Sequence, residues 1–376
     1  MSTARHAVLD NLKNLRGWRT NRKIIAIAVD DYANVRVASR GAREKLIQAG
    51  VDMSSQMDRY DTVETRQDLE ALFDVLESVS DGQNRAAIFT AYALSANPNC
   101  QKIIETGTYH YEPVSNTFAR LAEEQPTAYR GAWSAWRDGM DRGLIRPQFH
   151  GREHLNVEML RMKFENRDPA LLANLEHQSM AGLTDEPEMP GVGFTHAFGV
   201  HQVESIARHR EILVEGLGLF ERVWGFRSDT FTPPAQKLHP QLYSDAVENG
   251  IRSIDKPLRC TRPLGDGSYQ RELNCSGLQR GQDHITVVRN VVFEPGKDMG
   301  FAPVERALQQ IKAAFRWGKP AVISSHRVNF CGHIDPANRQ NGLDALQSLL
   351  KQVTEKWPEV EFLSVDQLVA EMILAG

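Results

Sequence analysis

The sequence lacks several features that would assign the chain to a particular class of protein. No apolar run approaches the roughly 18 residues of a membrane span, and the polar, basic stretch from Met1 to Lys23 has no signal-peptide pattern. We therefore expect a cytoplasmic protein without a membrane partner. Basic residues are outnumbered, since 44 Lys and Arg stand against 48 Asp and Glu for a net charge of −4, which argues against a nucleic-acid partner.

Cysteine is also scarce. The four cysteines form no C-x-x-C pair, which argues against a cysteine-type zinc site, and in a reducing compartment we expect free thiols. Gly216-Leu217-Gly218 lacks the third glycine of a nucleotide-binding fingerprint. Ser324 and Ser325 lack the G-x-S-x-G pattern of a nucleophile elbow, so a serine triad is not indicated.

The sequence does have an alternation of short apolar runs and amphipathic stretches. Apolar residues make up 41% of the 376 residues, enough for a sizeable core. Helical spacing of apolar residues predicts helices over 66–78, 304–317 and 343–353. Strands alternating with helices indicate a parallel sheet. The apolar runs that predict strands are 24–29, 86–91, 144–149, 192–195, 223–226, 285–288, 321–325 and 361–364.

This pattern predicts an α/β fold, a distorted seven- or eight-stranded β/α barrel. We expect a single domain over residues 1–376, because no linker or repeat divides the chain. The polar, Met-containing segment 166–190 predicts a helical insertion or lid within 155–220. The sequence leaves self-association open.

Polar residues suited to catalysis follow three of the predicted strands. Asp30-Asp31, His150 and His326 each come directly after an apolar run. The carboxyl ends of parallel strands form the active face of such folds, so we expect these residues to lie together.

Asp31, His150 and His154 are the candidate metal ligands. If His154 lies one helical turn beyond His150, the two imidazoles face the same way with Cβ atoms about 5–6 Å apart. Adjacent buried carboxylates need compensation, which a metal supplies. The alternatives are a chance histidine pair and an aspartate at a turn or helix cap. Imidazole and carboxylate together favour Zn²⁺, and Co²⁺ or Ni²⁺ would also fit.

His326 is the candidate proton donor. A histidine at the end of a buried strand can give a proton to a leaving group at neutral pH, and the alternative is a structural, hydrogen-bonded histidine. His196 and His201 are five residues apart and do not share a helix face, so we do not expect them to be ligands.

These motifs resemble those of the polysaccharide deacetylase superfamily, which has an aspartate pair, a H-x-x-x-H motif and a C-terminal histidine. Residues 289–295, 326–329 and 357–362 also resemble a bacterial branch of that group. The resemblance implies a distorted β/α barrel with a metal held by Asp31, His150 and His154. It implies Asp30 as base and His326 as acid in removing an acetyl group, N- or O-linked, from a small-molecule or oligosaccharide substrate.

One position departs from the family pattern. Thr232 stands where the family often has an arginine that steadies the base, and Arg227 upstream is the candidate substitute. Arg227, Arg327 and Asn329 are also the candidate substrate-binding residues.

Two other functions remain open from the sequence. His150-x-x-Glu153-His154 matches the H-x-x-E-H motif of an inverted zinc protease, in which Glu153 would be the base. The chain could also be a non-catalytic carbohydrate-binding barrel, and the departure at Thr232 favours that alternative.

Overall fold

The structure, a computed structural model, describes residues 3–263, 268–278 and 283–375. Within these residues the chain forms a ten-stranded sheet and two smaller antiparallel pairs. The pairs are β3 (Ala96–Pro98) with β4 (Tyr111–Pro113), and β8 (Arg259–Pro263) with β9 (Tyr269–Leu273). No helix in the described chain is both long enough and apolar enough to cross a membrane.

The large sheet is almost entirely parallel. Its described pairs all run parallel except β10 with β11. In spatial order the strands are β10 (Gly277–Leu278), β11 (Ile285–Val287), β7 (Ser253–Asp255), β6 (Thr230–Phe231), β5 (Ile145–Phe149), β2 (Phe89–Ala93), β1 (Ile24–Tyr32), β13 (Ala321–His326) and β12 (Val291–Val292), and β14 (Glu361–Phe362) pairs with the start of β1.

This sheet confirms the expected α/β fold. Eight strands run parallel in an unbroken series from β11 to β12, which is the number expected for a β/α barrel. The two end strands are separated by only residues 288–290 along the chain, yet they are not hydrogen-bonded to each other. Within the described residues the barrel is therefore open along a seam between β11 and β12.

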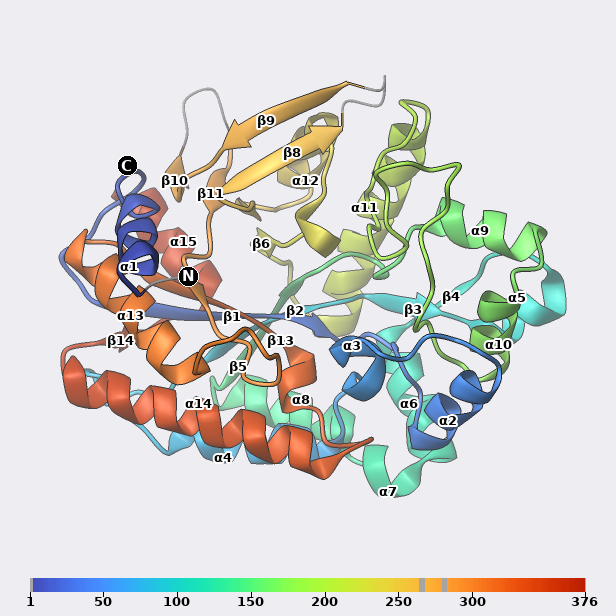
Figure 1. Ribbon diagram of the computed structural model, residues 1–376, viewed down its shortest axis with the longest axis horizontal. Coiled ribbons are helices and arrows are strands. Elements are labelled where there is room, and N and C mark those ends of the chain that lie inside the picture. The colour runs from blue at the N-terminus through green and yellow to red at the C-terminus, as the bar shows by residue number, and fades with distance from the viewer. Residues whose placement is uncertain (1–2, 264–267, 279–282, 376) are drawn as a thin grey trace.

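Helices cover the outside of the sheet (Figure 1). On one side α4 packs against α8 and α14, and α14 packs against α13, while α11 covers β5 and α15 contacts β1 and β11. The helices are α1 (Thr3–Leu12), α2 (Arg40–Gln48), α3 (Gln56–Tyr60), α4 (Arg66–Glu77), α5 (Cys100–Thr106), α6 (Val114–Glu124), α7 (Pro126–Tyr129), α8 (Ala132–Asp141), α9 (Val157–Glu165), α10 (Pro169–Glu176), α11 (Ser205–Trp224), α12 (Tyr243–Glu248), α13 (Pro303–Arg316), α14 (Pro336–Lys356) and α15 (Val365–Leu374), with short 3₁₀ turns η1 (Pro234–Gln236), η2 (Pro240–Leu242) and η3 (Arg327–Phe330).

Separate cores lie on the two sides of β1. Ile25, Ile27 and Val29 belong to the large core that includes the outer helices. Ala26 and Ala28 belong to a second core inside the curved sheet, to which α15 contributes. This alternation, one face toward the helices and one toward the interior, is what a strand buried on both sides requires.

Two predicted strands are wrong, and three strands of the eight-stranded parallel series were missed. Residues 192–195 form a loop. Residues 223–226 hold the end of α11 and its C-cap, Gly225, which has a φ of 85°. A short apolar run cannot distinguish a strand from the end of a buried helix. The missed strands β6, β7 and β12 are only two or three residues long, too short to show a period.

The predicted insertion over 155–220 contains α9, α10 and most of α11, joined by a long loop over 177–204. This loop brings Thr195 to the cavity that the candidate site lines. That the segment acts as a lid stays a prediction.

Arg327 is a structural residue, so the prediction that it binds substrate is wrong. Its side chain is 1% exposed and donates to Asp61 Oδ1, Glu64 Oε2 and the Asn34 carbonyl at 2.8–3.0 Å. Burial raises the pKa of Asp61 to about 6, against the charge of Arg327. The cluster ties the end of β13 to the loop that follows β1.

Replacing Arg327 with Met should destabilise the fold by about 3–5 kcal/mol, because two carboxylates would remain buried without their cation. Arg227→Met is the matched control, since its 68% exposed side chain should contribute less than about 0.5 kcal/mol. Urea unfolding followed by circular dichroism measures both. A loss below about 1 kcal/mol for Arg327→Met would show that the cluster is not stabilising.

Candidate metal centre

Near its carboxyl end, strand β1 carries two aspartates, Asp30 and Asp31, that line the same cavity. Successive side chains of a regular strand point to opposite faces, so Asp30 and Asp31 would normally diverge. The register of β1 against β2 shifts between Val29 and Tyr32, and Asp31 adopts a φ of 74°. Aspartate is one of the few residues besides glycine that tolerate this left-handed conformation. The bulge turns Asp31 toward the cavity that Asp30 already faces.

The two histidines come from a loop rather than a helix. Residues 150–156 are irregular and α9 begins only at Val157, so the expected helical turn between His150 and His154 is wrong. Gly151 has a φ of 121°, and a Cβ there would meet the Pro234 ring at 3.3 Å. Backbone N–H groups of β3 and the residue before it bond the Gly151 and Arg152 carbonyls at 3.2 and 2.7 Å, which fixes the loop.

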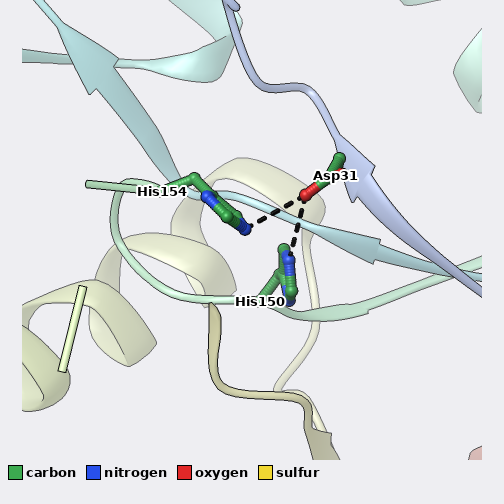
Figure 2. A group of neighbouring side chains, drawn as sticks. All are labelled: Asp31, His150 and His154. Carbon is green, nitrogen blue, oxygen red and sulfur yellow. Dashed lines mark ion pairs between the residues drawn. The ribbon is translucent and has the colours of Figure 1, made fainter. Parts of the chain in front are cut away.

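Asp31, His150 and His154 point toward one another (Figure 2). Their candidate ligand atoms all lie within 4.8 Å of one another. Asp31 Oδ1 is 3.4 Å from His150 Nε2 and 3.1 Å from His154 Nε2. Two ligands about 2.1 Å from a tetrahedral zinc ion lie roughly 3.4 Å apart, so these spacings suit one shared ion.

The hydrogen bonds of His150 support a metal ion. Its Nδ1 lies 2.7 Å from the Thr232 carbonyl, which only accepts, so Nδ1 carries the proton and Nε2 the lone pair. His150 is 2% exposed, and among the described residues its Nε2 has no hydrogen-bond partner. A buried nitrogen without a partner is costly unless it binds something else. The three residues therefore fit a divalent metal.

Asp31 is ionised in this arrangement. Although burial raises its pKa, the nearby imidazoles of His154 and His150 hold the pKa of this carboxyl well below its usual range. An ionised carboxylate is the form that ligates a metal.

Asp30 is held by Arg289 and not by Arg227. Arg289 Nη1 and Nη2 donate to the two oxygens of Asp30, each at 2.7 Å, and Nη2 also donates to Thr232 Oγ1 at 2.9 Å. Arg289 Nε pairs with Asp255. Burial raises the pKa of Asp30, but the charge of Arg289, with that of His326, outweighs it and lowers the pKa.

The expectations for Arg227, as substitute arginine and as substrate-binding residue, are therefore wrong. Arg227 precedes β6 and is exposed beside Glu221, at the strand end opposite the cavity. Thr232 follows β6, and its hydroxyl bonds both Arg289 and Asp255. The position that departs from the family pattern is thus filled by a guanidinium from another strand end.

His326 lies beside Asp30, as the sequence predicts, since the two are register partners of β13 and β1. His326 Nδ1 bonds Glu294 Oε1 at 2.7 Å, and Asn329 Nδ2 donates to Glu294 Oε2 at 2.6 Å. Burial lowers the pKa of His326, but the bond and charge of Glu294, then Asp31 and Asp30, raise it to about 10. The imidazole is therefore protonated at neutral pH, with Nε2 as its remaining donor.

Asn329 is a positioning residue rather than a substrate ligand, contrary to the prediction. It is fully buried, and its Oδ1 accepts from Gly296 N at 3.0 Å and Gln56 Nε2 at 3.2 Å. With both ends of the amide engaged, Asn329 fixes Glu294 and through it His326.

Glu153 does not face the metal centre. Its side chain is 1% exposed, and its two oxygens accept from Arg152 Nε and Nη2 at 2.5 and 2.6 Å. Arg152 also pairs with Glu215 of α11 and lies over the Tyr111 ring. Glu153 therefore stiffens the histidine loop and cannot act as the base of a zinc protease, so that alternative is not supported.

The candidate metal centre lies in a cavity of about 570 Å³. The cavity is polar where the strands end and apolar at Met57, Pro257 and Leu258. Its volume is within the range of small-molecule sites. Besides the residues already named, Arg36, Thr195, Pro233, Ala235, Gln236, Val292 and Ser324 line it.

Sequence reasoning missed Arg289, Glu294 and Asp255. Each lies at or just after one of the strands β7, β11 and β12, where polar residues of the active face are expected. β7 and β12 are not predicted from the sequence. The strand β11 is predicted, but Arg289, which follows it, was not proposed as a site residue. Only the rule that polar residues follow strands could have found them.

No family model and no curated protein matches the chain. Among solved structures, a candidate polysaccharide deacetylase from Mycobacterium smegmatis is similar with a TM-score of 0.45 and 12% identity, over 96% of this chain and 93% of that one. PuuE allantoinase is similar with a TM-score of 0.45 and 11% identity, over 94% and 91%. The family 4 carbohydrate esterase from Streptomyces lividans is similar with a TM-score of 0.33 and 13% identity, over 91% of both chains. The activity is inferred below from the side chains of this chain.

The metal centre makes a direct prediction. The double variant His150→Ala/His154→Ala should bind no stoichiometric Zn²⁺ after dialysis, because one carboxylate cannot hold the ion alone. His201→Ala is the matched control and should keep one ion per chain, since His201 does not line the cavity. Elemental analysis by mass spectrometry gives the stoichiometry. One ion per chain in the double variant would rule this site out.

Proposed function

We propose that the protein is a metal-dependent hydrolase that removes an acetyl group, N- or O-linked, from a carbohydrate. The observation that carries this proposal is the division between two adjacent aspartates. Asp31 faces the two imidazoles, whereas both oxygens of Asp30 are held by Arg289. This division supports Asp31 as a ligand and Asp30 as the base.

Asp31, His150 and His154 would hold the ion, with Zn²⁺ favoured and Co²⁺ or Ni²⁺ compatible. A bound divalent ion would lower the pKa of water and polarise the acyl carbonyl. The Thr232 carbonyl orients His150 by accepting from its Nδ1, which is a usual arrangement for a metal-ligating histidine.

Asp30 would accept the proton of the attacking water. It is ionised, since its pKa is lowered chiefly by Arg289 against the effect of burial. The guanidinium of Arg289 binds both oxygens of Asp30. It therefore holds the carboxylate beside the cavity in its ionised form. A base held in one orientation contributes to the rate more than a mobile one.

His326 would give a proton to the departing amine or sugar oxygen. Glu294 accepts from Nδ1, which leaves the Nε2 proton as the only one available to a substrate. Because Asp30 and His326 are register partners, the base and the acid lie on neighbouring strands at one end of the sheet. Hydrolysis of an amide or ester needs one group to take a proton and one to give it.

The substrate class rests on the motifs and on the cavity. The aspartate pair, the histidine pair and the C-terminal histidine resemble those of polysaccharide deacetylases, and the cavity is large enough for a sugar unit. A non-catalytic carbohydrate-binding protein is the second candidate. The departure at Thr232 that favoured it loses its force, because Arg289 supplies the guanidinium.

Removing the base or the acid should lower turnover by roughly 10²–10⁴-fold. Asp30→Asn and His326→Ala are compared with wild type and with the control Arg227→Met by acetate release from N- and O-acetylated sugars. Both variants should retain the metal, since neither residue is a ligand. A zinc-loaded wild type that is inactive on the whole panel would favour the binding protein over the enzyme.

Glu294→Gln should shift the alkaline limb of the kcat/KM profile to lower pH by roughly one to three units. An acid catalyst works below its pKa and is lost as the pH rises through it. Glu294 raises the pKa of His326, so removing its charge brings that loss to lower pH. Glu221→Gln, an exposed glutamate of α11, is the control. An unchanged alkaline limb in Glu294→Gln would mean that His326 is not the acid.

A further inference from the structure

Arg36 lies in the loop that follows β1 and lines the same cavity as Asp31, His150 and His154. None of the steps described above uses it. Its side chain is 18% exposed, in contrast to the fully buried Arg327.

The loop holds Arg36 in place through bonds from several elements. The Arg36 carbonyl accepts from Met180 N at 2.8 Å. On either side, Val35 N donates to Asn97 Oδ1 at 2.9 Å and Val37 N donates to the Asp61 carbonyl at 3.1 Å. A side chain on a fixed backbone loses less entropy when it binds a ligand, so Arg36 is pre-organised.

Asp58 fixes the guanidinium as well. Arg36 Nε donates to Asp58 Oδ1 at 2.8 Å, and Nη2 lies 2.8 Å from the same oxygen. Asp58 Oδ1 also accepts from Gly182 N at 3.1 Å, and Oδ2 accepts from Ser55 Oγ at 2.5 Å. The carboxylate is thus held from two further directions, which sets the orientation of Arg36.

One edge of this guanidinium remains unused. A guanidinium carries five N–H donors, and Asp58 engages only the edge formed by Nε and Nη2. No other described residue is hydrogen-bonded or ion-paired to the Arg36 guanidinium, so the edge formed by Nη1 and Nη2 is available for a bidentate bond. Arg289 and Arg327 differ, because all three nitrogens of each bond protein oxygens.

We propose that Arg36 binds a carboxylate of the substrate, so that the enzyme prefers acylated sugars that carry an acidic group. The proposal rests on the proposed function and specifies its substrate class. A planar carboxylate matches the two parallel N–H groups of a guanidinium edge, and Arg is the residue best suited to this contact. A less polar surrounding strengthens such a bond, and the apolar side chains of Met57 and Leu258 line the same cavity.

The test compares one neutral sugar with two acidic counterparts on the zinc-loaded protein. N-acetylglucosamine is neutral, N-acetylmuramic acid carries a carboxylate on its O3 lactyl ether, and 2-acetamido-2-deoxyglucuronic acid carries one at C6. Wild type should bind at least one acidic sugar about 10-fold to 100-fold more tightly than N-acetylglucosamine in isothermal titration calorimetry. Arg36→Met should remove this preference and leave the affinity for N-acetylglucosamine within about two-fold.

Two further variants control for folding and net charge. Arg36→Lys keeps the charge without the bidentate edge and should lose most of the preference, while Arg227→Met removes a cation outside the cavity and should keep all of it. Thermal unfolding and zinc stoichiometry verify that each variant is folded and loaded.

Binding is measured separately from turnover, so the two proposals can fail independently. Preferential binding of an acidic sugar without acetate release contradicts the proposed function and leaves the role of Arg36 supported. Acetate release with equal affinity for the neutral and acidic sugars, no binding of any of the three, or a preference that survives in Arg36→Met overturns the proposal for Arg36.

Discussion

The rest of the site depends on the ion pairs of one guanidinium, that of Arg289. It lies between β11 and β12, where the parallel series of strands is open, and is shared by Asp30 of β1 and Asp255 of β7. The hydroxyl of Thr232, after β6, bonds both Arg289 and Asp255. A buried cation between two carboxylates is stable only if its geometry satisfies every donor, as it does here. The ion network therefore fixes the strand ends relative to one another across the seam.

This network separates two adjacent aspartates that would otherwise compete for one role. With both oxygens of Asp30 bound to Arg289, Asp31 is left to face the imidazoles of His150 and His154. A second network, formed by Glu294 and Asn329, fixes the orientation of His326. Asp30 and His326 are thus each oriented by a buried partner, which is how a site keeps the geometry of flexible side chains.

The sequence was sufficient to predict the α/β fold and to name the residues that the structure brings together at Asp31 and His326, because these follow strands long enough to recognise. The sequence could not identify Arg289 as a site residue, because Arg289 lies in the seam between two strands and no periodic pattern marks it. Arg227 was chosen for its closeness to Thr232 in sequence, but a strand separates the two and places them at opposite ends of the sheet. The prediction that Arg327 binds substrate is wrong for a related reason. Arg327 follows His326 directly, but its side chain is buried with Asp61 and Glu64, away from the cavity.

The most direct test is a pair of crystal structures of the zinc-loaded protein, wild type and Arg289→Met. In wild type we expect one ion bound by Asp31 Oδ1 and by Nε2 of His150 and of His154, with Asp30 on Arg289 and off the ion. In Arg289→Met we expect Asp30 to lose this orientation and turn toward the ion. An ion bound elsewhere, Asp30 as a ligand in wild type, or an unmoved Asp30 in the variant would contradict the role assigned to Arg289.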